Sequence, residues 1–124
     1  MNSVFLFLAA VCAFLGVAMG AFGAHGLKSV LTADMMTVYR TAVDYQMWHA
    51  LGLGLVAMVR QQMPEVHLLR WSGWLMFAGI VLFSGSLYLL AILNLRWLGM
   101  VTPLGGLAFL AAWACLAIVA FKSK

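Results

Sequence analysis

The sequence predicts an all-α membrane protein folded as a bundle of four transmembrane helices. Of its 124 residues, 66% are hydrophobic and 8% are charged, and the mean hydropathy is +1.07. That composition leaves too little polar material to cover a water-soluble globule. The apolar residues form four runs, each near the roughly 20 residues that a helix needs to cross a ~30 Å hydrocarbon core. We therefore expect a single transmembrane domain over residues 1–124.

The first helix is expected at about residues 3–24. Its start, "MNSVFLF", carries no Lys or Arg, and the apolar run is longer than the core of a signal peptide, so we expect a retained span rather than a cleaved leader. Small residues recur at four-residue spacing through Gly16 and Gly20, with Gly23 flanking them. This pattern is typical of helices whose backbones approach closely.

The second helix, at about residues 39–59, is the least hydrophobic of the four and the most informative. Arg40 and Asp44 are spaced so that they can pair along the helix. A helical wheel places the polar residues on one half of the surface, which predicts that this half faces protein rather than lipid. That half contains Arg40, Thr41, Asp44, Tyr45, Trp48, His49 and Gly52.

The third helix is expected at about residues 71–93 and the fourth at about 98–121. In the third, Ser84 and Tyr88 share a stripe while Ser86 points away from it, and we expect the serine hydroxyls to bond within their own helix. In the fourth, Thr102 and the following proline resemble a cap and a first turn, so the regular helix is expected to begin there. A second small-residue face combines Gly105, Ala108 and Ala112.

The basic residues predict the orientation of the chain in the membrane. Four spans place both termini on one side, and the residues flanking the spans favour the cytoplasm for that side. The side of the termini carries Arg60, Arg70, Lys122 and Lys124, against Lys28, Arg40 and Arg96 on the other. We therefore expect both termini in the cytoplasm.

The polar residues of the spans converge on the outer half of the expected bundle. Polar groups in lipid cost several kcal/mol each without partners, so we expect a shared interior network. In it, His49 bonds to a group on the first or third helix. Each member has both a structural and a functional interpretation, the latter as a ligand or proton site. The candidate cluster comprises His25, Arg40, Asp44, Tyr45, His49, Ser84, Tyr88 and Thr102.

Four segments of the chain also carry a resemblance to a known family. The stretches "GAFGAHGL", "YQMWHALGLG", "FSGSLYLL" and "TPLGGLAFLAAW" occur in the order and spacing of small bacterial inner-membrane proteins of unknown function, the YgdD and YwdK type. The similarity covers nearly the whole chain. It implies a four-helix inner-membrane protein and supplies no catalytic residue to carry over.

Two function classes stay open after the sequence is read. We expect no enzyme, because the chain lacks hydrolase, metalloprotease and phosphate-loop motifs. We also expect no cofactor, no metal and no nucleic-acid partner. A haem between His25 and His49 is disfavoured by their roughly 14 Å difference in depth.

One hypothesis is a structural or accessory protein that associates with itself or with a membrane-protein partner through its small-residue faces. The other is a small proton, ion or solute carrier or channel, with an outward-facing cavity around His49, Asp44 and Tyr88.

Overall fold

The first half of the molecule is a helical hairpin. A computed structural model describes residues 3–122 of the chain and contains no strand in that range. Helix α1 (Val4–Phe22) begins at Ser3, whose hydroxyl accepts a hydrogen bond from the Leu6 N–H, and continues directly into a π-helical turn, η1 (Gly23–Leu27). Helix α2 (Ala33–Gln62) begins after Thr32, whose hydroxyl caps the first turn by accepting from the Met35 N–H. Such caps satisfy backbone donors that a helix start leaves unpaired.

The second half is another hairpin, whose first rod contains a π-helical turn. Helix α3 (His67–Gly79), the π-helical turn η2 (Ile80–Ser84) and helix α4 (Gly85–Leu93) follow one another without a break. Asn94 then adopts a left-handed conformation, with φ of 56°, and ends the rod. A short 3₁₀ segment, η3 (Arg96–Met100), leads into α5 (Thr102–Lys122).

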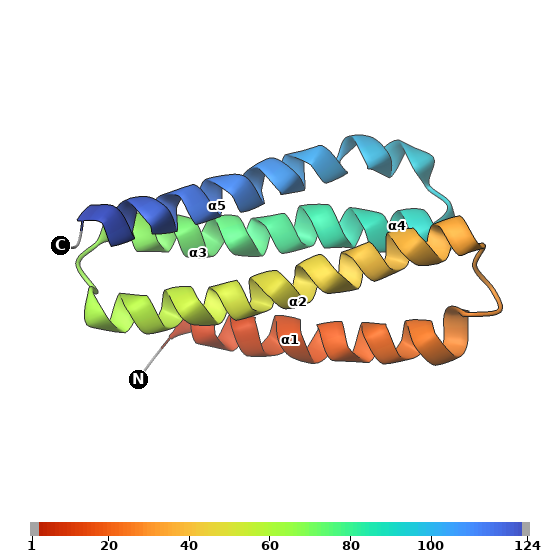
Figure 1. The fold of residues 1–124 in the computed structure, drawn as a ribbon, viewed down its shortest axis with the longest axis horizontal. Coiled ribbons are helices and arrows are strands. Elements are labelled where there is room, and N and C mark those ends of the chain that lie inside the picture. The colour runs from red at the N-terminus through yellow and green to blue at the C-terminus, as the bar shows by residue number, and fades with distance from the viewer. Residues whose placement is uncertain (1–2, 123–124) are drawn as a thin grey trace.

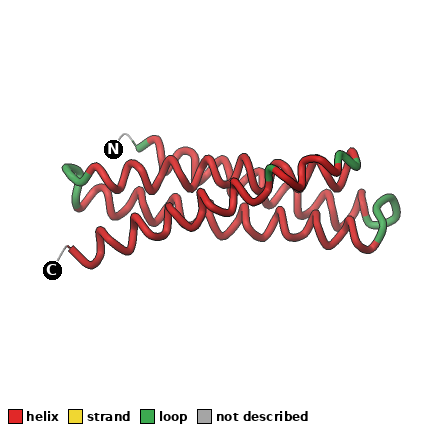
Figure 2. The backbone as a smooth tube through the Cα atoms, turned by 90° about the horizontal axis from the view of Figure 1, so that it is seen from above, coloured by secondary structure: helices red, strands yellow, loops and turns green. Residues whose placement is uncertain are grey.

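These elements form four antiparallel rods along one long axis (Figure 1). The N- and C-terminal ends lie at the same end of the bundle as the α2–α3 turn, and the α1–α2 loop lies at the other. Figure 2 shows the same two loops at opposite ends from above. Helix α2 packs against α1 on one side and against α3, η2 and α4 on the other. Helix α2 is therefore the rod of the first hairpin that packs against the second hairpin.

Three of the rods are long and apolar enough to cross a membrane, and α2 is not among them. The three are Val4–Leu27, His67–Leu93 and Arg96–Lys122. Helix α2 carries Asp34, Arg40, Asp44 and Arg60 along its 30 residues, which lowers its mean hydropathy. The all-α expectation is therefore confirmed for the described chain, with three candidate spans in place of the expected four.

The observed helices extend beyond the apolar runs that predicted them. Residues 3–24, 39–59, 71–93 and 98–121 were the expected ranges, whereas α2 starts at Ala33 and α3 starts at His67. Hydropathy marks only the part of a helix that suits lipid, while capping and backbone hydrogen bonds extend the helix into polar sequence. The fourth helix begins at Thr102, as the Thr-Pro pair predicts, and the residues before it form η3.

The small-residue faces are used inside the bundle. A Cβ added to Gly16 would overlap the Met47 side chain, and one added to Gly23 would overlap the Tyr39 ring. At Gly105 the overlap is with the backbone of Phe83. Gly20 packs at ordinary distance against α2, Ala112 is fully buried and Ala108 is half-buried. These positions hold α1 against α2 and α5 against the α3–η2–α4 rod.

Candidate functional site

A chain of hydrogen bonds through Gln46 crosses the interior. The Tyr88 hydroxyl donates to Gln46 Oε1 at 2.6 Å, and Gln46 Nε2 donates to the Cys12 carbonyl oxygen at 2.8 Å. Gln46 is only 5% exposed. This Gln46 chain (Cys12, Gln46 and Tyr88) links α1, α2 and α4 and satisfies both ends of the buried amide.

Two neighbouring contacts lie beside the Gln46 chain, on the side of the α1–α2 loop. The Tyr39 ring meets the Tyr88 ring edge-on, with centroids 5.3 Å apart, and the Tyr39 hydroxyl donates to the Met19 carbonyl. Ser84 Oγ donates to the Ala42 carbonyl at 2.7 Å. Ser84 therefore bonds across to α2, where a bond within its own helix was expected.

His49 forms a second, separate polar contact. Its Nδ1 lies 2.8 Å from the Tyr45 carbonyl oxygen, and its Nε2 lies 2.9 Å from Trp113 Nε1. A carbonyl only accepts and an indole N–H only donates, so this geometry fits a neutral ring with its proton on Nδ1. The partner of His49 lies on α5, whereas the first or third helix was expected to supply it. We call His49 and Trp113 the His49 pair.

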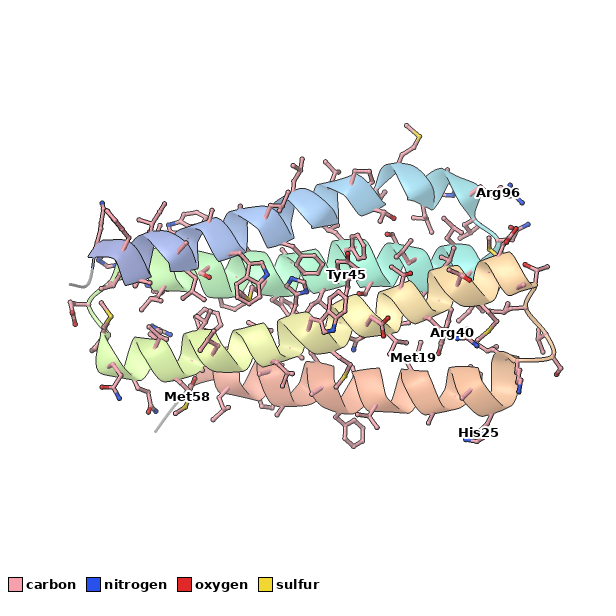
Figure 3. All side chains as sticks on the ribbon, viewed as in Figure 1. Met19, His25, Arg40, Tyr45, Met58 and Arg96 are labelled. Atoms are coloured by element: carbon pink, nitrogen blue, oxygen red, sulfur yellow. The ribbon has the colours of Figure 1, made fainter. Side chains whose placement is uncertain are left out.

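A surface groove opens beside the His49 pair. It has a volume of about 640 Å³. The ring of Phe109 stacks on His49 with centroids 3.5 Å apart, and Tyr45 lies along the same wall near the middle of the bundle (Figure 3). No hydrogen bond to the Tyr45 hydroxyl is found among residues 3–122. The α5 side of the groove contains Pro103, Gly106, Leu107, Leu110 and Trp113.

Three members of the expected cluster lie outside the interior. His25 points away from the bundle, and Arg40 lies near the same end (Figure 3). Arg40 and Asp44 are exposed, and both line a small cavity of about 120 Å³ beside α1. Trp48, on the same expected half of α2, is 56% exposed. A helical wheel groups residues correctly but does not fix which way a group faces, and residues near a helix end can reach solvent while the middle of the helix is enclosed.

The remaining candidate, Thr102 of α5, contacts Ser86 of α4. Ser86 Oγ lies 2.6 Å from Thr102 Oγ1 and 2.9 Å from the Phe83 carbonyl oxygen. Ser86 is buried, although the sequence placed it away from the polar stripe. The candidates inside the bundle thus divide among the Gln46 chain with its neighbours, the His49 pair and the Ser86–Thr102 contact. His25, Arg40 and Asp44 are exposed, so no single network joins the cluster.

Sequence reasoning missed Gln46, Trp113 and Ser72. Ser72 Oγ donates to the Ala112 carbonyl at 2.8 Å. Gln46 had a usable signal, because an amide in an apolar span needs partners inside the protein, and it shares a buried face with Tyr39 and Leu53 at helical spacing. Trp113 had none, since its partner becomes visible only in three dimensions.

The interior is chemically satisfied within the described range. No buried side-chain nitrogen or oxygen there lacks a hydrogen-bond partner. Residues 3–122 also contain no group of three or more His, Cys, Asp or Glu side chains placed to hold a metal ion. The arrangement joins the helices to one another, and the groove is a recess beside the His49 pair.

Comparison with known proteins supports the resemblance read from the motifs. Residues 19–106 match the family described as "Protein of unknown function (DUF423)". The chain is 47% identical to the UPF0382 membrane protein YwdK of Bacillus subtilis (strain 168), over 96% of this chain and 97% of that protein. It is 41% identical to the UPF0382 inner membrane protein YgdD of Escherichia coli (strain K12), over 96% of this chain and 90% of that protein. No solved structure matches the chain.

Proposed function

This chain belongs to the DUF423 family of UPF0382 membrane proteins, and on that premise we propose that it is an accessory protein of the bacterial inner membrane. In this proposal it associates with a second copy or with a membrane-protein partner. The observation that carries the proposal is the fully satisfied interior of the described chain. A carrier needs polar groups that a substrate can engage, whereas every buried side-chain nitrogen and oxygen of the described residues is hydrogen-bonded within the protein.

We propose that α2 is the fourth membrane span. The argument is topological. Helix α2 runs the whole length of the bundle from the C-terminal end of the first apolar rod to the N-terminal end of the next, and it lies antiparallel to both (Figure 1). If its neighbours cross the bilayer, α2 must cross with them. Its buried polar residues, Gln46 and His49, have partners on other helices, which lowers the cost of holding them in lipid.

The cytoplasm is the proposed side for both termini. At the end that they share, Arg60 and Arg70 flank the α2–α3 turn and Lys122 ends α5. Lys124, which the sequence adds to the same tally, lies outside the described residues. An excess of Lys and Arg in short flanking segments favours the cytoplasmic side.

The proposed association surface is the groove beside the His49 pair. The small-residue faces first expected to serve this purpose are already used within the bundle. The groove instead offers Gly106, where an added Cβ would meet nothing closer than 4.0 Å, and the unbonded Tyr45 hydroxyl. A glycine that admits a close backbone and a free hydroxyl that accepts a bond suit a transmembrane helix as occupant.

Site-specific crosslinking in membranes tests this surface. In a chain whose Cys12 and Cys115 are replaced by alanine, we expect Leu110→Cys to crosslink to a second copy or to another membrane protein. The matched control is Val17→Cys on α1, which is 63% exposed but outside the groove. Equal crosslinking from both positions, or none from Leu110→Cys, would contradict the proposal.

The competing carrier hypothesis makes the opposite prediction at Ser84. That side chain is fully buried and bonded to α2. In the same cysteine-free background, a membrane-impermeant thiol reagent should leave Ser84→Cys unmodified in intact cells. Rapid modification would reveal an aqueous cavity and favour the carrier.

A further inference from the structure

A cluster of cationic and aromatic side chains marks the start of α3. His67, Arg70, Trp71 and Trp74 line a cavity of about 380 Å³. Their spacing places them on one face of the helix. Trp71 is 62% exposed and Trp74 is 44% exposed, so the two indoles border open space rather than the protein interior. We call these four residues the headgroup site.

The first hairpin, through residues of α1 and α2, supports this face of α3. Phe5 of α1 is fully buried against α3, where a Cβ on Gly73 would overlap its ring. The Phe5 ring meets Trp74 edge-on with centroids 5.3 Å apart, and the guanidinium carbon of Arg60 lies 5.5 Å from the Phe5 centroid. The aromatic wall is therefore fixed in place, and a cation–π contact holds a second guanidinium near it.

The charge at this end of the bundle is positive and partly uncompensated. Arg70 has no ion-pair partner among residues 3–122. Glu65 is the only described acid at this end, because Asp34 and Asp44 lie on α2 toward the opposite one. An exposed guanidinium without an acid beside it suits the bidentate hydrogen bonding that phosphate offers.

Charged, aromatic and aliphatic side chains follow one another along α3 in the same order as the phosphate, glycerol and acyl chains of a phospholipid. Arg70 lies one turn, or ~6 Å, from Trp74 toward the end of the bundle. Beyond Trp74, the same rod presents Val81, which is 54% exposed. Indoles favour the depth between headgroups and chains. Charge, indole and aliphatic surface thus follow one another as phosphate, glycerol ester and acyl chain do.

We infer that the headgroup site binds an anionic glycerophospholipid, with its phosphodiester on Arg70 and its glycerol and upper acyl chain against Trp71 and Trp74. His67 borders the same phosphate from the helix start. The ligand class follows from charge complementarity and from the order of groups along α3. The inference holds for either leaflet, so it does not depend on the proposed orientation or on the groove beside the His49 pair.

Lipid titration of the purified full chain tests this site. Dioleoylphosphatidylglycerol is added to the protein in detergent, and retained lipid is counted by native mass spectrometry. Dioleoylphosphatidylcholine is the comparison lipid. We expect one tightly retained phosphatidylglycerol, and Arg70→Gln should weaken its binding about fivefold or more, since a basic residue near an anionic surface contributes about 1 kcal/mol.

The other end of the bundle provides the matched control. Arg96 precedes Trp97, which is 63% exposed, and Arg96→Gln should leave the binding unchanged. Equal losses from both variants would reduce the effect to general interfacial attraction and overturn the site. Equal retention of phosphatidylcholine would do the same.

Two further arms distinguish the remaining outcomes. Displacement of the lipid by inorganic phosphate at millimolar concentration would show a site for the free anion instead of a lipid, and would overturn the inference. Arg70→Gln should also melt at the wild-type temperature in phosphatidylcholine, because Arg70 is exposed and bonded to nothing in the described chain. A lowered melting temperature there would assign Arg70 a structural role and contradict the lipid role.

Discussion

Replacing Gln46 with leucine removes the amide at the centre of the Gln46 chain. The variant loses the bonds to the Tyr88 hydroxyl and to the Cys12 carbonyl, and leucine fills a similar volume without a polar atom. Hydrogen bonds between membrane helices contribute about 0.6 kcal/mol each on average. A half-buried hydroxyl left without an acceptor adds a desolvation cost, for a total of about 2 kcal/mol.

A double-mutant cycle separates these contributions. We expect Tyr88→Phe alone to lower the free energy of unfolding by about 1 kcal/mol, because it removes one bond and leaves Gln46 Oε1 unpaired. The double variant should lose only about 1 kcal/mol rather than the sum, since the shared bond is lost only once and neither the Tyr88 hydroxyl nor Gln46 Oε1 remains to be left unpaired. Equilibrium unfolding in mixed micelles measures all three values.

The control for the cycle is Gln61→Leu, at an exposed position near the end of α2. It should change the free energy of unfolding by no more than about 0.5 kcal/mol. Additive losses in the double variant would refute the reasoning, because they would mean that Gln46 and Tyr88 act independently. A Gln46→Leu variant as stable as the Gln61 control would refute it as well.

Three other predictions address packing, the His49 pair and topology. Gly105→Ala should destabilise the protein by about 1–3 kcal/mol, because the added Cβ would overlap the backbone of Phe83. Gly85→Ala is the control: its Cβ would enter open space, so the variant should be neutral or more stable by up to about 1 kcal/mol. Equilibrium unfolding in micelles compares the two variants, and similar losses of stability would contradict the packing. His49→Leu and Trp113→Phe should each destabilise by about 1 kcal/mol, and the double variant by less than their sum; an additive result would show that the bond between them contributes nothing. A reporter active only in the cytoplasm and fused after Lys124 should be active, while activity of a periplasm-only reporter there would reverse the orientation.

The helical architecture could be predicted from the sequence because hydropathy and helix length are local properties. The four apolar runs correspond to four rods, and α5 begins at the Thr-Pro pair that predicted its start. The Thr102 hydroxyl donates to the Leu98 carbonyl oxygen and does not cap the first turn, although the sequence had suggested a cap. The status of α2 was harder to predict, since its charged residues, together with the buried Gln46 and His49, lower the hydropathy that identifies a span. The hydrogen-bond partners of Gln46 and His49 lie on other helices, and an average of hydropathy along the sequence does not include them.

The candidate site was only partly accessible from the sequence, for a geometric reason. A helical wheel placed His49 and Asp44 on one face, yet His49 is buried against Trp113 while Asp44 is exposed. The direction in which that face points depends on contacts made by residues far apart in the chain. The Gly16 and Gly23 contacts with α2 fix the rotation of the first hairpin, and those overlaps are not visible in a single sequence.

The π-helical turn η2 lets one rod serve two different neighbours. Before the turn, Ser72 donates to a carbonyl of α5; within and after it, Ser84 and Tyr88 donate to α2, while Ser86 meets Thr102 of α5. A π turn accommodates one extra residue, and one residue corresponds to about 100° of rotation around a helix. Deleting a single residue between Ile80 and Ser84 would straighten the rod while turning its two halves out of phase. The insertion thus sets a fixed angle between the two halves, at which Ser84 and Tyr88 reach α2 while Ser86 stays against α5.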